Sequence, residues 1–220
     1  MLKALIFDFD GLILDTETPE YYALNEAYAE YGLELPITTY GLVVGAQYNQ
    51  EYEPVKHLQE LTGKTLDTDA FWQKVSRRRM ELIDQNPLLP GVEELIRESQ
   101  ARGLKLAVAS SSPHKWVDGH LKRFNLYRYF DAVKCKEDVV NIKPEPDLFL
   151  AALNALHVQP DEAVIFEDSL NGVIAAGQAG IRVVVITNPV TEHLQIEGET
   201  LRLRSLADTS IDELLRKLYL

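Results

Sequence analysis

The chain has 220 residues, of which 46% are hydrophobic and 25% are charged, a composition that excludes a largely disordered protein and allows a sizeable core. The formal net charge of -12 argues against a nucleic-acid-binding protein, because such proteins contact phosphates through a basic face. No stretch approaches the roughly 20 apolar residues of a membrane-spanning helix, and the apolar run after Lys3 is too short for a signal peptide. Cys135 is the single cysteine, so no intrachain disulfide can form. We therefore expect a cytoplasmic protein without membrane or nucleic-acid partners, and we take it to be a monomer.

The chain opens with a short apolar strand, residues 4–7, that is followed by two aspartates with one residue between them. Because side chains alternate along an extended strand, Asp8 and Asp10 would point the same way if the strand continued. Gly11 then allows the backbone to turn and to approach a ligand closely, since it has no Cβ. Two carboxylates about 4 Å apart repel each other by roughly 4 kcal/mol at an effective dielectric of about 20. A divalent metal ion held by oxygen ligands is the simplest way to offset that repulsion.

The next segment has only helical patterns. Thr18 and the proline after it resemble an N-cap and a first helical residue, and a stripe of tyrosine and leucine continues to Gly32, which can close the helix. The same spacing predicts further helices over residues 50–61 and from about residue 68. Because no strand pattern interrupts them, we predict an all-helical cap domain at residues 16–85.

Strand and helix patterns alternate from residue 86 onward. Short apolar runs predict strands at residues 104–109, 131–135, 163–166 and 181–186. Helical patterns begin near residues 92, 113, 146, 169 and 210. Residues 187–209 receive only a loose assignment.

Near-continuous apolar strands between helices are typical of a parallel sheet that is covered on both faces. The first strand belongs with this set. We therefore predict an α/β fold, in which residues 1–15 and 86–220 form a catalytic core domain. This core is a Rossmann-like parallel sheet with helices on both faces, and the small all-helical cap domain is inserted into it.

Ligands bind beyond the carboxyl ends of the strands in open α/β sheets. The residues found after the predicted strands offer a nucleophile, a hydroxyl group, an ammonium group and metal-ligating acids: Asp8, Asp10, Ser110, Lys143, Glu167 and Asp168. This combination suits phosphoryl transfer, in which positioning and charge neutralisation supply most of the catalysis.

Each of these side chains also has a purely structural alternative. Ser110 could cap the following helix, although Ser111 and Ser112 fit that role better. Lys143 could be a solvated lysine before a proline turn. Glu167 and its neighbour could cap the helix that starts at Ser169, where acids suit the positive end of the helix dipole.

Four stretches resemble the motifs of the haloacid dehalogenase-like hydrolases. They are the run DFDGLILDTE from Asp8, the serine at Ser110, the segment KPEPD from Lys143, and the acidic pair before Ser169, in the expected order along most of the chain. The helical insert is similar to the cap of the subfamily that includes β-phosphoglucomutase and many sugar-phosphate phosphatases. The aspartate at position 10 argues against dehalogenase chemistry, since the true dehalogenases of the superfamily lack it.

The resemblance implies a Mg²⁺-dependent reaction on a small phosphorylated metabolite. Asp8 would attack the phosphorus, and Asp10 would protonate the leaving oxygen and then take a proton from water. The metal ion would be held by a carboxylate oxygen of the first aspartate, the backbone carbonyl of the second, and Asp168, with Glu167 as a further acid at the metal site. The implied phosphate-binding groups are backbone N–H groups and side chains of Phe9, Gly11, Ser110, Ser111 and Lys143.

Three functions remain open at this point. A phosphatase is preferred to a β-phosphoglucomutase-like enzyme, because that mutase resembles this chain in Asp15 and Thr16 but has a histidine where Glu20 stands. Its cap also supplies an arginine shortly after the glycine that matches Gly45, and residues 46–49 contain none. The third possibility is a non-enzymatic protein on the same scaffold that senses metal or phosphate or binds a partner.

Substrate choice in this subfamily comes largely from the cap. The candidates for substrate contact are Glu20, Gln47 and Asn49, together with Tyr21 and one of the arginines at 77–79. Three consecutive arginines span more than half of a helix's circumference, so at most one or two of them could face a site. The sequence leaves open whether the leaving group is a sugar, a nucleoside or a glycolate-like acid.

Overall fold

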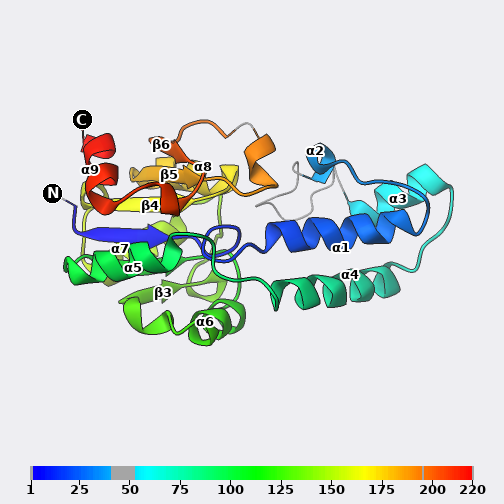
Figure 1. Cartoon of the computed structure of the whole chain (residues 1–220), viewed down its shortest axis with the longest axis horizontal. Coiled ribbons are helices and arrows are strands. Elements are labelled where there is room, and N and C mark those ends of the chain that lie inside the picture. The colour runs from blue at the N-terminus through cyan, green and yellow to red at the C-terminus, as the bar shows by residue number, and fades with distance from the viewer. Residues whose placement is uncertain (1, 41–52, 195, 220) are drawn as a thin grey trace.

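The computed structural model describes residues 2–40, 53–194 and 196–219. Figure 1 shows an elongated molecule with two parts: a sheet flanked by helices, and a lobe made only of helices at the other end. Both chain termini lie on the sheet-containing part, at the end away from the helical lobe (Figure 1).

The sheet-containing part is built on a parallel sheet with the order β3-β2-β1-β4-β5-β6. The first strand, β1, is central and pairs with β2 and β4, so that Phe7 lies opposite Val108 on one side and Phe166 on the other. The bounds of the strands are β1 (Ala4–Phe7), β2 (Lys105–Ala109), β3 (Ala132–Lys134), β4 (Ala163–Glu167), β5 (Arg182–Ile186) and β6 (Leu201–Leu203).

Alternate residues of the central strands enter two separate hydrophobic cores. Leu5 and Phe7 of β1 pack on the face covered by α5 (Val92–Ala101), α6 (His114–Arg123) and α9 (Ile211–Tyr219). Ala4 and Ile6 pack on the face covered by α7 (Asp147–Leu156) and α8 (Leu170–Ala179). Burial on both faces explains why these strands are apolar throughout, and the predicted α/β fold with helices on both faces is confirmed.

The helical lobe has a hydrophobic core of its own. It consists of α1 (Glu17–Ala29), α2 (Ile37–Tyr40), α3 (Pro54–Thr62) and α4 (Thr68–Ile83), of which α1 and α4 run side by side (Figure 1). The side chains of Tyr28 and Phe71 are buried between these helices. Among the described residues of this segment there is no strand, as expected, and the domain boundaries at 15/16 and 85/86 stay a prediction.

Several predicted element ends differ from the structure. The first helix begins at Glu17, two residues earlier than predicted, with Thr16 instead of Thr18 at the N-cap position, and the carboxylate of Asp15 accepts the backbone N–H of Thr18 at 3.0 Å. The short helix α2 and the strand β6 were not predicted. The start of the helix expected at residue 50 lies outside the described residues, and its described part ends at Gly63, which has a left-handed φ of 65°.

The remaining regular elements are short 3-10 helices between the strands and helices of the sheet-containing part: Tyr127–Tyr129, Lys136–Asp138, Pro160–Glu162, Thr191–His193 and Leu206–Asp208.

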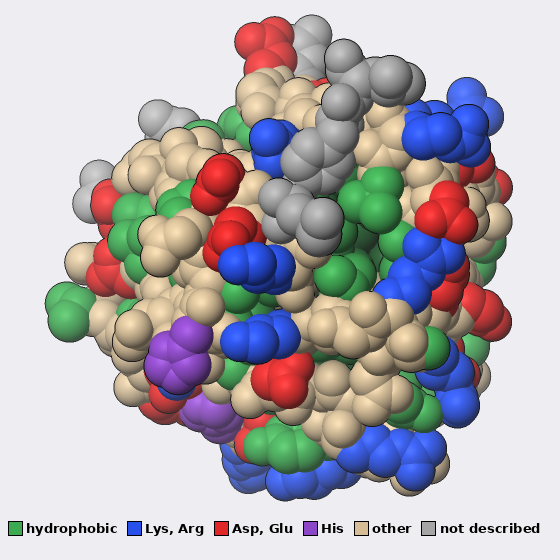
Figure 2. Space-filling model, turned by 90° about the vertical axis from the view of Figure 1, so that its left-hand side faces the viewer, with side chains coloured by type: hydrophobic (Ala, Val, Ile, Leu, Met, Phe, Trp, Pro, Cys, Tyr) green, Lys and Arg blue, Asp and Glu red, His purple; other side chains and the backbone are tan. Residues whose placement is uncertain are grey.

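Figure 2 shows the end of the molecule that carries the chain termini, where basic and acidic side chains are interspersed. In the described part of the chain, no helix has both the length and the apolar character needed to cross a lipid bilayer.

Candidate active site

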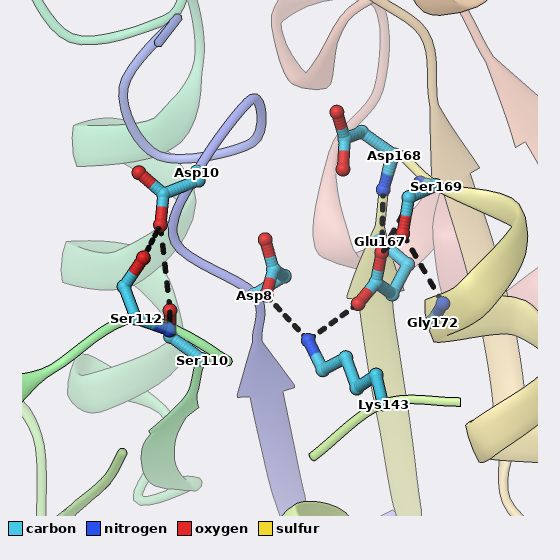
Figure 3. Close-up of polar contacts among 9 residues, drawn as sticks. All are labelled: Asp8, Asp10, Ser110, Ser112, Lys143, Glu167, Asp168, Ser169 and Gly172. Carbon is cyan, nitrogen blue, oxygen red and sulfur yellow. Dashed lines mark hydrogen bonds and ion pairs between the residues drawn. The ribbon is translucent and has the colours of Figure 1, made fainter. Parts of the chain in front are cut away.

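The carboxylate of Asp8 lies just beyond the end of β1 and forms a buried ion pair with Lys143 (Figure 3). The same ammonium group contacts Oε1 of Glu167 at 2.5 Å. All three side chains are buried, and the Lys143 ammonium lies 4.8 Å from the centre of the Phe149 ring. Residues that are far apart in the sequence therefore meet at the carboxyl end of the sheet, as the sequence predicted.

The carboxyl group of Glu167 is held in place by several contacts. Its Oε2 accepts hydrogen bonds from the backbone N–H groups of Asp168 and Ser169, at 3.0 and 3.1 Å, and from the Ser169 hydroxyl at 3.0 Å. A Cβ built on Gly172 would lie 1.8 Å from the carboxyl carbon of Glu167, so only glycine fits there. The geometry makes Glu167 a holder of Lys143, and its predicted role as a metal ligand stays a prediction.

Asp168 is oriented by the loop after β5. Asn188 donates a hydrogen bond from its amide nitrogen to Oδ2 of Asp168 at 2.8 Å and a second to the carbonyl oxygen of Gly11 at 3.2 Å. Gly11 has a φ of +76°, and a Cβ there would lie 2.0 Å from Oδ2 of Asp168. The glycine of the first motif thus allows the turn after β1 to pass against the acid that follows β4.

Asp10 has a different set of partners from Asp8. Its Oδ2 accepts a hydrogen bond from the Ser112 hydroxyl at 2.6 Å and a longer one from the Ser110 hydroxyl at 3.5 Å (Figure 3). Its Oδ1 accepts the indole N–H of Trp116 at 2.8 Å. Ser112 was expected to cap the next helix, but its hydroxyl points to Asp10 instead and the helix begins without a side-chain cap.

The buried charges do not balance. One carboxylate oxygen each of Asp8, Glu167 and Asp168 lies within 4.8 Å of the others, and Lys143 is the single ammonium group that contacts them among the described residues. Burial raises the pKa of Asp8 to about 8, partly offset by Lys143. Burial and repulsion from Glu167 and Asp8 raise the pKa of Asp168 well above its usual value.

The excess charge fits a divalent cation. Three carboxylates and one ammonium group leave two negative charges, and oxygen ligands are those that Mg²⁺ and Ca²⁺ prefer. Asp8 and Asp168 each keep carboxylate capacity beyond the contacts described, which suits them as ligands. The donor set therefore agrees with the predicted metal site.

Three of the five predicted phosphate-binding residues lie in the same cavity as the acids. Ser110, Ser111 and Lys143 line a cavity of about 980 Å³ together with Asp8 and Asp10. The backbone N–H of Gly11 donates to the carbonyl of Leu14 at 2.8 Å. Phe9 has a fully buried side chain, so only its backbone could serve a ligand. The phosphate-binding roles stay predictions, and for Gly11 a phosphate contact would need that hydrogen bond to open.

The helical lobe closes the other side of the cavity. Glu17 and Glu20 of α1, Tyr40 of α2 and Arg79 of α4 line it. Glu20 was among the predicted substrate contacts, and it accepts a hydrogen bond from Arg79 at 2.8 Å. Gln47 and Asn49 lie outside the described residues. Tyr21 does not line the cavity; its hydroxyl donates to the carbonyl of Leu35 at 3.0 Å.

A family model for haloacid dehalogenase-like hydrolases matches residues 5–186. The chain belongs to this hydrolase family. The family resemblance predicted from the four motifs is therefore confirmed.

Relatives of this hydrolase include named phosphatases. It is 42% identical over 215 residues to the "Putative phosphatase YhcW" of Bacillus subtilis, which covers 98% of this chain and 97% of the relative. It is 33% identical to the "Phosphorylated carbohydrates phosphatase" of Thermotoga maritima, with 82% of each chain covered. Among solved structures, CbbY from Rhodobacter sphaeroides in complex with phosphate superposes with a TM-score of 0.71 at 29% identity, over 94% of this chain and 96% of that chain.

Sequence reasoning missed part of the hydrolase site. Trp116 was assigned to a helical packing stripe, and Asn188 fell in the segment without an assignment. Glu17 was overlooked because the helix was expected to begin after it. A signal for Glu17 did exist, since an acid directly after Asp15 and Thr16 continues the first motif toward the cap.

Proposed function

We propose that this hydrolase is a Mg²⁺-dependent phosphatase that acts on a small phosphorylated metabolite, a sugar phosphate or a similar phosphomonoester, through an aspartyl-phosphate intermediate. Its class is given by its family and by the phosphatases among its relatives: it is a phosphoric monoester hydrolase. The metal, the intermediate and the substrate are the proposed part.

The observation that carries the proposal is the surplus of buried negative charge around Asp8. A carboxylate at the end of a central strand, held by one ammonium group and next to two more acids, is costly to bury unless a cation binds there, and that cation would also attract a phosphoryl group. The Lys143 ammonium is well placed to contact both the Asp8 nucleophile and a transferring phosphoryl group. It orients the nucleophile now and can contact a phosphoryl oxygen in the complex.

The proposed reaction has two halves. An Asp8 oxygen attacks the phosphorus and forms an aspartyl-phosphate, while Asp10 gives its proton to the leaving oxygen. Asp10 then takes a proton from a water molecule, which attacks the phosphorus and releases inorganic phosphate, so that both aspartates return to their starting states. Ser110 and Lys143 hold the transferring group between the two steps.

A metal ion would be held by Asp8, the backbone carbonyl of Asp10, and Asp168, with Asn188 orienting the last of these. When bound, it supplies positive charge that offsets the phosphoryl oxygens and the acids around them. The hydrogen bonds to Glu167 keep Lys143 in place whether or not the metal is bound.

A phosphomutase of the β-phosphoglucomutase kind is the alternative. Such an enzyme must return the phosphoryl group to its sugar faster than water takes it. Position 20, where that mutase has a histidine, carries a glutamate that is paired with Arg79. Among the described residues no histidine lines the cavity, which favours hydrolysis.

The test is phosphate release from p-nitrophenyl phosphate and from a panel of sugar phosphates with the purified protein in Mg²⁺. We expect turnover by the native protein and a loss of at least about 1,000-fold in Asp8→Asn, since the nucleophile is gone. Asp161→Asn, an exposed aspartate far from the cavity, is the matched control. Full activity in Asp8→Asn would eliminate the covalent mechanism, and conversion of sugar phosphates into isomers without phosphate release would establish the mutase.

A further inference from the structure

The cavity has two chemically different walls. The wall at the carboxyl end of the sheet carries the acids, Lys143 and the serines of the proposed phosphoryl site. The wall contributed by the helical lobe carries Glu17, Glu20, Tyr40 and Arg79. A phosphomonoester whose phosphorus lies next to Asp8 must direct its leaving group toward this second wall, so its side chains decide which leaving group fits.

The lobe wall has no cationic surplus. Its two carboxylates face one guanidinium group, and Arg79 already donates to Glu20 at 2.8 Å. The charged cavity residues that remain outside the phosphoryl site are Lys136 and Glu145, one of each sign. A second phosphate or a carboxylate on the substrate would thus meet a wall with no net positive charge to offset its own negative charge.

The segment of the lobe that the structure does not describe cannot reverse this balance. Residues 41–52 contain no lysine, arginine or histidine, and they add one further acid, Glu51. The absence of basic residues is a property of the sequence and holds for any placement of the segment. The two other arginines of the α4 triplet do not line the cavity, and Arg78 is paired with Glu26.

The same wall is well suited to hydroxyl groups. Carboxylate oxygens accept hydrogen bonds, a tyrosine hydroxyl both donates and accepts, and a guanidinium group donates. Glu17 is the centre of this set: its Oε2 accepts the hydroxyl of Tyr40 at 3.2 Å, which fixes the carboxyl group at the cavity wall. Burial, together with repulsion from Glu20 and Asp10, raises the pKa of Glu17 to about 8, so near neutral pH its carboxyl group can also donate a hydrogen bond.

From this arrangement we propose that Glu17, supported by Tyr40 and flanked by Glu20 and Arg79, is the specificity-determining residue of a subsite for an uncharged, polyhydroxyl leaving group. The enzyme accordingly selects monophosphates of sugars or sugar alcohols over bisphosphates and over phosphorylated carboxylic acids. This inference rests on the proposed phosphatase function and narrows its substrate class. The bisphosphate seen in a mutant of CbbY, a structural relative, marks the class that this wall excludes.

The first experiment compares kcat/KM for three small phosphomonoesters whose leaving groups differ in charge: sorbitol 6-phosphate, fructose 1,6-bisphosphate and phosphoglycolate. We expect the neutral polyol phosphate to be preferred by roughly tenfold or more, because a second anionic group would lose its hydration at a wall that has no net positive charge. A preference for the bisphosphate or for phosphoglycolate overturns the inference and leaves the phosphatase function intact. No turnover of any probe, p-nitrophenyl phosphate included, overturns both.

The second experiment assigns the preference to Glu17. Glu17→Gln keeps the size of the side chain, and we expect kcat/KM for sorbitol 6-phosphate to fall by roughly tenfold, mainly through KM, with a smaller loss for p-nitrophenyl phosphate, whose leaving group offers no sugar-like hydroxyl groups. Glu17→Lys should raise the ratio of bisphosphate to polyol phosphate turnover. Glu26→Gln, on the exposed face of the same helix, is the control. Equal losses on all substrates would show a structural role and would contradict the assignment.

Discussion

The indole N–H of Trp116 donates a hydrogen bond of 2.8 Å to Oδ1 of Asp10, joining the first turn of helix α6 to the turn after the central strand. The indole ring packs against the imidazole ring of His120, with 4.3 Å between the two ring centroids. Burial lowers the pKa of His120, so a neutral imidazole packs there. An indole N–H can only donate, so this contact fixes Oδ1 of Asp10 as an acceptor and orients the carboxyl group.

Trp116→Phe should therefore slow the reaction without changing how tightly substrate binds. A hydrogen bond to a charged group contributes about 1.5–3 kcal/mol, so we expect kcat to fall about tenfold or more with KM within about twofold. Steady-state kinetics with p-nitrophenyl phosphate measure both values. Trp72→Phe in the helical lobe is the control, and an unchanged kcat in Trp116→Phe would show that the indole does not position the acid.

Removal of divalent metal should abolish activity and lower thermal stability. Two uncompensated negative charges at the buried acids are expected to make Mg²⁺ a stabilising ligand, worth about 2.7 kcal/mol at 100 times its dissociation constant. Activity should disappear in EDTA and return with Mg²⁺, and the melting temperature should rise with Mg²⁺. Asp168→Asn should lose this thermal shift; a shift of native size in that variant would place the metal elsewhere.

The pH dependence of stability follows from the same acids. The pKa of Asp8 rises from 3.8 to about 8 on folding, and that of Asp168 also rises. Between these pH values the folded protein binds more protons than the unfolded chain does. In the absence of metal, its free energy of unfolding should therefore decrease as the pH rises through this window.

The variant Asp168→Asn tests this pH dependence of stability directly, because it removes one of the carboxylates that repel each other. In EDTA at pH 8 the variant should be more stable than the native protein, because the ionised Asp168 is desolvated and repelled by Glu167 and Asp8 in the folded state. At pH 5 the difference should be smaller, because the raised pKa of Asp168 favours its uncharged form as the pH falls. Denaturant unfolding at the two pH values measures the difference in the free energy of unfolding. A variant that is less stable than the native protein at pH 8 would show that repulsion among the buried acids does not destabilise the metal-free protein.

The residues that sequence analysis located correctly are those that directly follow apolar strands. Phe7 pairs in register with Phe166, so the acids after β1 and β4 must emerge together at the same edge of the sheet. The local sequence pattern was sufficient to place these acids, because the in-register pairing of the strands determines where the residues after each strand lie. The predicted meeting of Asp8 and Asp168 at one ion-sized site is what the structure shows.

The contacts that could not be predicted join residues with no shared local pattern. Ser112 and Trp116 reach Asp10 across sequence separations of 102 and 106 residues, and either would fit equally well as a helix cap or as a packing residue. The strand β6 has three residues, one of them the exposed Arg202, too few to establish an alternating pattern. Asn188 is a polar residue in a loop, whose role depends entirely on the approach of Asp168.

Two glycines of the same helix should respond in opposite ways to alanine. At Gly172 a Cβ would lie 1.8 Å from the Glu167 carboxyl group, whereas at Gly177 no atom outside the local helix lies within 4 Å. Gly172→Ala must push Glu167 away, which releases Lys143 from one of its two partners and shifts the ammonium group at the nucleophile.

We expect Gly172→Ala to lose about 1–3 kcal/mol of stability through overpacking and about 100-fold in kcat/KM through misplacement of the phosphoryl site. Gly177→Ala should gain about 0.5–1 kcal/mol, because alanine favours a helix interior, and should keep native activity. Thermal unfolding and p-nitrophenyl phosphate turnover of the two variants, measured side by side, check the pair. Native activity in Gly172→Ala would mean that Glu167 does not hold Lys143 for catalysis.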